Sequence, residues 1–160
     1  MLMTHRFLLA MFGVSIAFGV HGCGSELAKP KEEKLVPASG IVKVDGKPSK
    51  GVTLLFHPAD EKKNLGGCWG QTDDDGKFTV THPSNKPGIP FGTYYVTLSR
   101  FLKPDGTVPD KKEPFITSGA TESIAEKWSA IAKVKQRNVT IIPDNGTSSL
   151  EFEIASIKKK

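Results

Sequence analysis

The chain has 160 residues, which is enough for one compact domain once its two ends are set aside. Its net charge is +5, but its only arginines after Arg6 are Arg100 and Arg137, so no arginine-rich patch is interleaved with aromatic residues. This composition argues against nucleic-acid binding and favours a mildly basic surface that suits anionic lipid headgroups or wall polymers.

Residues 1–22 have the pattern of a signal peptide. Arg6 precedes an apolar run over residues 7–20 that only Gly13, Ser15 and Gly19 interrupt. A run of 14 residues has the length of a signal-peptide core and is too short to span a bilayer as a stable helix. A short transmembrane anchor is therefore the less favoured interpretation.

The residues that follow, Val20-His21-Gly22-Cys23, resemble the bacterial lipobox. The resemblance implies that Cys23 receives a diacylglyceryl thioether and becomes the first residue of a mature, membrane-anchored lipoprotein of the cell envelope. One acyl chain holds a protein only marginally, so stable attachment needs further chains such as palmitate. The alternative is an unmodified cysteine at a secretory cleavage site.

Residues 23–37 are expected to form a lipidated, flexible tether. This stretch contains prolines and charges of both signs and almost nothing apolar to bury, a composition that keeps a chain extended and solvated. With Cys23 acylated, Cys68 has no intramolecular disulfide partner. A hydrophobic core must then hold the domain together.

Alternating apolar and polar residues, separated by turns such as Asp45-Gly46, predict antiparallel strands joined as hairpins. The expected strands are residues 40–45, 52–57, 68–72, 77–81, 93–100, 137–142 and 149–155. Apolar residues that share a face of their strand are Val42 and Val44; Val52, Leu54 and Phe56; Tyr94, Val96 and Leu98; and Val139 and Ile141. Residues expected to point inward are Phe78, Val80, Leu150, Phe152 and Ile154.

A short helix is predicted near residues 123–132, with an extended segment as the alternative. Ser123 and Glu126 have the spacing of a capping box. Ile124, Trp128 and Ile131 follow at spacings of four and three, which places them on one face of a helix. We therefore expect Trp128 to pack in the core.

The motifs at residues 40–56, 72–78 and 90–96 resemble the carboxypeptidase regulatory-like, transthyretin-like domains of small bacterial lipoproteins. The resemblance covers residues 38–156 and leaves 157–160 as a basic tail. It implies an all-β fold, a seven-stranded antiparallel Greek-key sandwich. The family's motif residues are structural, so the resemblance supplies no catalytic positions.

Three consecutive carboxylates, Asp73, Asp74 and Asp75, suggest a weak cation site, with Asp73 and Asp75 as the candidate ligands. However, the EF-hand spacing is absent and no bidentate glutamate follows at the required distance. Because aspartate and glycine are also the residues that a tight hairpin requires, we favour a turn and expect no metal.

Cys68 and Trp69 lie among glycines. A nucleophilic cysteine needs a base, and the only histidines after the signal peptide are His57 and His82, so we expect a half-buried thiol instead. Trp69 is the one candidate ligand contact, since an exposed indole could stack on a sugar or a partner. Core packing is the favoured interpretation of Trp69, and ligand contact is the alternative.

These observations predict a non-enzymatic, membrane-anchored lipoprotein that acts as a binding or structural module of the cell envelope, without a cofactor. Its expected partners are the lipid bilayer, through acylated Cys23, and an envelope protein or glycan, but no nucleic acid. One alternative is a calcium-dependent adhesion module. The other is a small envelope hydrolase, which a pocket joining His57, His82 and a carboxylate would support.

Overall fold

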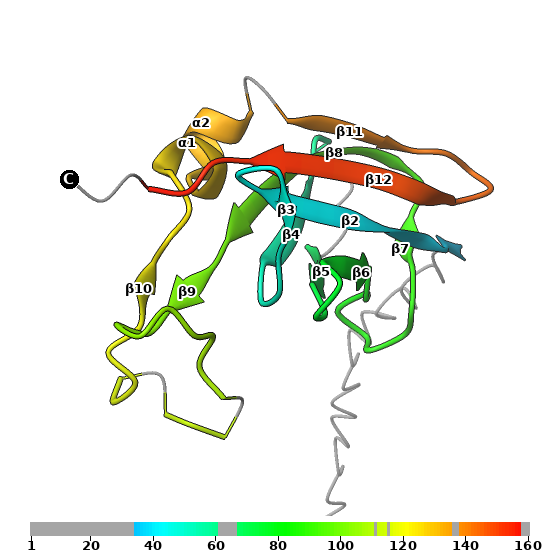
Figure 1. Cartoon of the computed structure of the whole chain (residues 1–160). Coiled ribbons are helices and arrows are strands. Elements are labelled where there is room, and N and C mark those ends of the chain that lie inside the picture. Colours follow the sequence, from blue (N-terminus) through cyan, green and yellow to red (C-terminus); the bar gives the residue numbers. More distant parts are fainter. Residues whose placement is uncertain (1–33, 61–66, 111, 115, 136–137, 158–160) are drawn as a thin grey trace, which may run out of the picture. The chain divides into compact units, whose positions relative to one another are not determined.

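The alternating residues form strands whose apolar faces meet in an all-β sandwich with two short helices (Figure 1). This computed structural model describes residues 34–60, 67–110, 112–114, 116–135 and 138–157. The expected signal peptide, Cys23 and the tether up to residue 33 lie outside the described residues. The all-β prediction is confirmed.

One sheet has the strand order β11–β8–β4–β5, and all its neighbours are antiparallel. Its strands are β11 (Val139–Ile142), β8 (Gly92–Ser99), β4 (Thr53–Pro58) and β5 (Cys68–Gln71). On its inner face Leu54 lies opposite Leu98, and Phe56 lies opposite Val96. Val139 and Ile141 share the outer face of β11 and are exposed.

The second sheet centres on β2 (Ala38–Val44), which pairs with β12 (Thr147–Ile154) on one side. Its other side pairs with β3 (Lys47–Pro48) and β6 (Lys77–Thr79). β2 and β12 run parallel, so the antiparallel expectation is wrong for this pair. Alternation shows which face of a strand is buried, but it does not show the direction of the neighbouring strand.

Gly40 allows the close approach of β2 and β12. A Cβ atom at this position would overlap the Leu150 carbonyl oxygen. The register of the pair also shifts between Thr147 and Leu150. A glycine within a strand often marks such a bulge or close backbone contact.

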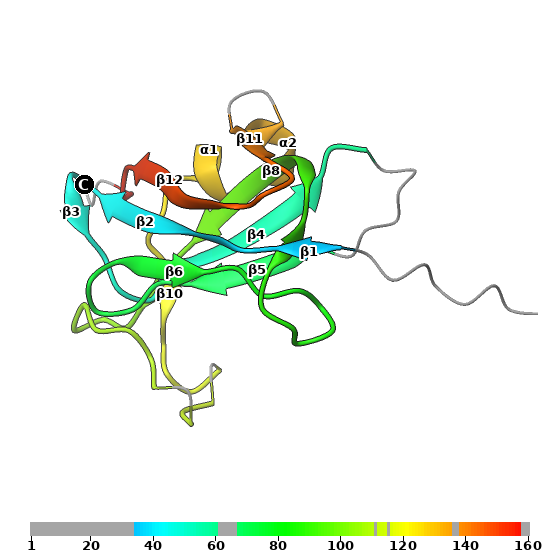
Figure 2. The same cartoon turned by 90° about the vertical axis from the view of Figure 1, so that its right-hand side faces the viewer.

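The hairpin of β5 and β6 joins the two sheets (Figure 2). β5 is bridged to the residues just after β6, because the Trp69 backbone N–H donates to the Thr81 carbonyl at 3.0 Å and the Thr81 N–H donates back to Trp69 at 2.7 Å. β5 belongs to the first sheet and β6 to the second, so their outer faces continue into one another.

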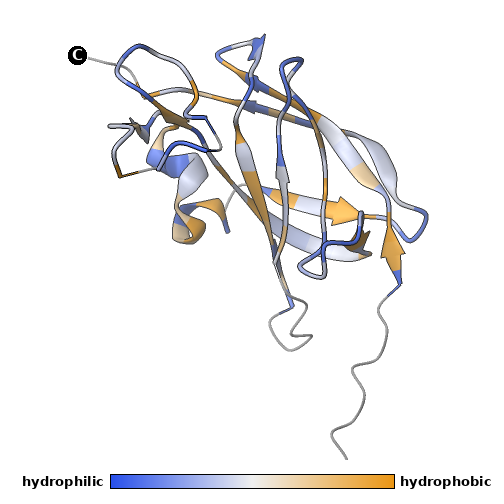
Figure 3. Ribbon diagram, turned by 90° about the horizontal axis from the view of Figure 1, so that it is seen from below, coloured by the Kyte–Doolittle hydropathy of each residue, from blue (hydrophilic) through white to orange (hydrophobic). Residues whose placement is uncertain are grey.

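The core lies between the sheets, and apolar residues are spread over the strands of both (Figure 3). Phe56 has its ring centre 6.4 Å from that of Phe78 and 6.2 Å from that of Tyr94. Buried residues that the alternation placed on a shared or inner face are Val42, Val44, Val52, Leu54, Phe56, Phe78, Val80, Tyr94, Val96, Leu98 and Ile154. Leu150 and Phe152 are partly buried against this core.

The domain extends further toward the N-terminus than expected. Leu35 and Val36, which we assigned to the tether, form β1 (Leu35–Val36) and pair with β7 (Ile89–Pro90). Val36 is only 3% exposed and belongs to the hydrophobic core. The strand has only two residues and is flanked by prolines and charged residues, so the sequence pattern does not predict it.

The helical segment differs from the prediction. It consists of α1 (Glu126–Ser129) and α2 (Ile131–Val134), separated by Ala130 in an extended conformation. The predicted capping box is wrong, because the Ser123 hydroxyl donates to the Arg100 carbonyl at 2.7 Å.

The apolar face of this segment also differs from the prediction. Ile124 is buried, but it precedes the helices and forms a bridge with Ser156. Trp128 packs against the core as expected, whereas Ile131 is exposed and Val134 is buried in its place. Since the break at Ala130 interrupts the 3.6-residue period, a continuous helix gives the wrong face beyond Trp128.

The long polar segment after β8 is bounded by a short antiparallel pair. β9 (Phe101–Leu102) pairs with β10 (Thr121–Glu122), and the two extend away from the sheets in Figure 1. Glu122 fixes the base of this arm, because its Oε1 atom accepts the backbone N–H groups of Arg100 and Ile124 at 2.9 and 2.8 Å.

Candidate functional site

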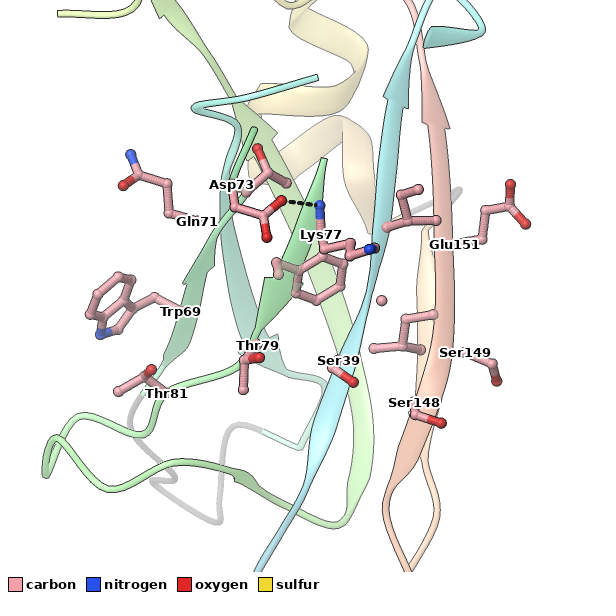
Figure 4. Close-up of a pocket in the computed structure, with 15 residues that line it drawn as sticks. Ser39, Trp69, Gln71, Asp73, Lys77, Thr79, Thr81, Ser148, Ser149 and Glu151 are labelled. Carbon is pink, nitrogen blue, oxygen red and sulfur yellow. Dashed lines mark hydrogen bonds between the residues drawn. The ribbon is translucent and has the colours of Figure 1, made fainter. Parts of the chain in front are cut away.

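A groove of about 1260 Å³ crosses the outer faces of β5, β6, β2 and β12 (Figure 4). Outward-facing residues of these four strands and their connections line it, and their side chains are mostly polar. The lining residues include Ser39, Trp69, Gln71, Lys77, Thr79, Thr81, Ser148, Ser149 and Glu151. These side chains come from three distant parts of the sequence, which the β5–β6 hairpin and the parallel β2–β12 pair bring together.

Trp69 is the large exposed aromatic residue of this groove. Its side chain is 42% exposed on the outer face of β5, so the core packing that the sequence favoured for Trp69 is wrong. It pairs across β5 and β4 with Leu55, and its backbone bridges to Thr81. Figure 4 shows the indole projecting from β5, beside Gln71 and above Thr81.

Two charged side chains of the groove, Glu151 and Lys77, have partners of opposite charge. Glu151 accepts a hydrogen bond from Lys43 at 2.5 Å, and the hydrogen bond and charge of Glu151 raise the pKa of Lys43. Lys77 Nζ lies 3.4 Å from a carboxylate oxygen of Asp75. The groove therefore presents hydroxyls, an amide and an indole alongside paired charges.

The three consecutive aspartates bind different partners. Asp73 Oδ1 accepts the backbone N–H groups of Asp75 and Lys77 at 3.0 and 2.8 Å. Asp74 pairs with Lys50 at 2.6 Å, and this hydrogen bond and charge raise the pKa of Lys50. Gly76 completes the turn with a φ of 74°. The favoured interpretation of this stretch as a turn is confirmed.

No group of three or more His, Cys, Asp or Glu side chains that could hold a metal ion occurs within the described ranges. The candidates Asp73 and Asp75 lie in the turn and do not converge on a common centre with Asp74. Asp73 uses its Oδ1 atom for the backbone, whereas Asp75 faces Lys77.

Cys68 and His57 lie on opposite faces of the first sheet. Cys68 is fully buried in the core, opposite Phe56, so the expectation of a half-buried thiol is wrong. His57 is on the outer face, with Nε2 3.0 Å from Thr97 Oγ1. Burial, followed by the positive charge of Lys135, lowers the pKa of His57. His57 is therefore not placed to act as a base for Cys68.

His82 lies in the loop after β6. Its Nδ1 atom is 2.8 Å from Ser84 Oγ and accepts the Ser84 backbone N–H at 3.2 Å. These contacts are local to the loop, whereas His57 contacts Thr97 on the outer face of the first sheet.

A second, smaller hollow of about 560 Å³ lies beside the start of β8. Phe91, which is 51% exposed, lines it together with Pro58, Ala59 and Thr93. This hollow shares no lining residue with the groove around Trp69. Phe91 is therefore an exposed aromatic residue outside the groove.

The sequence offered Trp69 as a ligand contact only as the less favoured alternative to core packing, and it missed the rest of the groove. The outward positions Ser39, Thr79 and Glu151 alternate with buried or partly buried residues, so the sequence pattern predicts that they face outward. The pattern does not predict that these residues lie together. Their common location depends on the parallel β2–β12 pair and on the hairpin whose strands, β5 and β6, belong to different sheets.

Comparisons with protein-family models, curated proteins and solved structures found no match to this chain. The likeness to transthyretin-like lipoproteins therefore remains an expectation from the motifs. Within the part of the chain that the structure describes, no helix is long and apolar enough to cross a membrane.

Proposed function

We propose that this protein is a non-enzymatic binding module, held at a membrane of the cell envelope by acyl chains on Cys23. The observation that carries the proposal is the Trp69 groove, an open surface on which hydroxyl and amide side chains surround an exposed indole. Ligand sites combine an apolar or aromatic lining with a few polar groups that fix the orientation of the ligand.

The roles of the chemically reactive side chains support a binding function. Cys68 is part of the core, Asp73 fixes a turn, and His57 contacts a threonine hydroxyl. A nucleophile with its base, or a pair of carboxylates with divergent pKa values, would instead favour an enzyme.

The N-terminal sequence supports the anchor. Cys23 follows a signal-peptide core and a lipobox-like stretch, and a polar segment separates it from the first described strand. Anchoring by acyl chains would hold the domain near the membrane while leaving the sheet faces accessible to partners in the envelope.

The test is metabolic labelling of the full-length chain with an alkyne analogue of palmitate in a bacterial host. We expect label on the wild-type protein and its recovery with the membrane fraction. The Cys23→Ser variant should lose both label and membrane attachment, because serine cannot form the thioether. Label or membrane attachment that persists in Cys23→Ser would contradict the anchor.

A further inference from the structure

We infer that the Trp69 groove binds a neutral polysaccharide chain, with a sugar ring stacked on the indole. The inference rests on the proposed binding function and names the class of ligand.

The side chains match the two kinds of surface on a sugar ring. A pyranose has a face of C–H groups and a rim of hydroxyls. The exposed indole of Trp69 offers an amphipathic surface for the face. Gln71 carries both donors and an acceptor, and hydroxyls on neighbouring strands can donate and accept around the rim. The hydroxyl-bearing residues that line the groove and are not buried are Ser39, Thr79, Thr81, Ser148 and Ser149.

The paired charges favour a neutral ligand. Lys77 faces Asp75, Glu151 is hydrogen-bonded to Lys43, and Asp73 accepts two backbone N–H groups, so each charged side chain of the groove already has a partner within the protein. An anionic polymer would have to compete with Asp75 for the lysine, and a cationic one with Lys43 for the glutamate. Complementary potentials are what charged partners require.

The size of the groove favours a chain of several sugars over a single small molecule. Its volume of about 1260 Å³ exceeds the roughly 300–1,000 Å³ of typical small-molecule pockets. It also runs across four strands, from Trp69 on β5 to Glu151 on β12 (Figure 4). An extended ligand could stack on the indole and still reach the hydroxyls of β12.

The same lining argues against a protein as the occupant. The centre of a protein–protein interface is normally apolar and rich in aromatic side chains. Here, Trp69 is the one exposed large aromatic residue among the lining side chains, and serine and threonine side chains lie on the strands and loops beside it. A hydroxyl-rich ligand can form hydrogen bonds with these side chains, which an apolar protein patch cannot do.

The test is calorimetric titration of the full-length protein, purified in a detergent without a sugar headgroup. The neutral probes are the hexasaccharides cellohexaose, maltohexaose and chitohexaose, and the anionic probe is hexagalacturonate. We expect at least one neutral probe to bind, and hexagalacturonate to bind at least about tenfold more weakly than that probe.

Two variants locate the binding. Trp69→Ala should weaken binding by about tenfold or more, whereas Trp69→Phe, which keeps an aromatic face, should weaken it less. Phe91→Ala is the matched control, since it removes an exposed aromatic residue outside the groove, and its affinity should remain unchanged. Thermal melting of each variant verifies that the fold is retained.

Three results would overturn the inference. One is that no neutral probe binds at millimolar concentration, which would leave a protein as the occupant to examine. The others are equal affinity of Trp69→Ala and wild type, and tighter binding of hexagalacturonate than of every neutral probe. Because acyl labelling of Cys23 does not depend on the groove, a failure here is distinct from a failure of the proposed anchor.

Discussion

The surroundings of His57 lower its pKa, and this shift affects how the stability of the protein depends on pH. It lies on the outer face of β4, where its ring contacts Thr97 and faces the positive charge of Lys135. Burial is the larger cause of its lowered pKa, and Lys135 adds to it. Both effects disfavour the charged imidazolium in the folded state.

We therefore expect His57 to make the protein less stable as the pH falls. The unfolded chain binds the proton at the usual pKa of 6.5, whereas the folded protein binds it only at lower pH. The stabilising contribution is fully present above pH 6.5 and declines as the pH falls through the folded pKa. NMR titration of the imidazole should give a pKa below 6.5.

The control for this prediction is His57→Gln, which keeps a polar side chain but does not titrate. Its melting temperature should fall less than that of wild type between pH 7.5 and pH 5.5, because one proton-linked contribution is absent. Equal pH dependence of the two proteins would contradict the assignment to His57.

At the scale of single elements, the β5–β6 hairpin depends on its turn. Asp73 Oδ1 accepts two backbone N–H groups, and the Asp73 backbone exchanges further hydrogen bonds with Lys77 and Gly76. Since this hairpin carries Trp69 and joins the two sheets, the turn supports the groove as well as the fold.

Asp73→Ala should lower the free energy of unfolding by about 1–2 kcal/mol, because two backbone donors lose their acceptor. Asp73→Asn keeps a carbonyl oxygen and should lower it less. Asp75→Ala is the matched control, as it removes only an exposed ion pair with Lys77 and should change stability by less than about 1 kcal/mol. Urea titration of the three variants measures the differences.

The same protein preparations test the calcium alternative. Because the Asp73 oxygen serves the backbone and Asp74 pairs with Lys50, we expect the melting temperature to be the same in millimolar calcium and in chelator. A rise of several degrees with calcium would restore the adhesion hypothesis.

The helical segment shows why one element was harder to predict than the strands. Strand faces follow a period of two, so a few residues such as Leu54 and Phe56 suffice to identify the buried side. The helix prediction needed a continuous 3.6-residue period from Ile124 to Ile131. Ala130 breaks that period in an extended conformation, and tertiary contacts of Ile124 and Val134 decide what is buried.

At the scale of the whole molecule, the faces of the strands were predictable, but their neighbours were not. Val42, Phe78 and Tyr94 are buried as the alternation indicated. The parallel pairing of β2 with β12 joins positions more than 100 residues apart, and no local pattern specifies it. The groove depends on this pairing, so only its aromatic residue could be named from the sequence.

The first described residues of the chain form part of the folded domain. Val36 on β1 is buried in the core, and the Pro37 carbonyl accepts the Thr147 backbone N–H at 2.9 Å. β1 pairs with β7, and the next strand, β2, pairs with β12. Residues 35–37 therefore contact two distant parts of the domain, which a free tether would not do.

Val36→Asp tests where the domain begins. It should lower the free energy of unfolding by about 3 kcal/mol or more, because an aspartate there would be a buried charge without a partner. Lys34→Asp is the matched control, since it introduces the same side chain two residues earlier at an exposed position. Urea titration should show a large loss only for Val36→Asp. Equal stability of the two variants would mean that residues 35–37 belong to the tether, as the composition alone indicated.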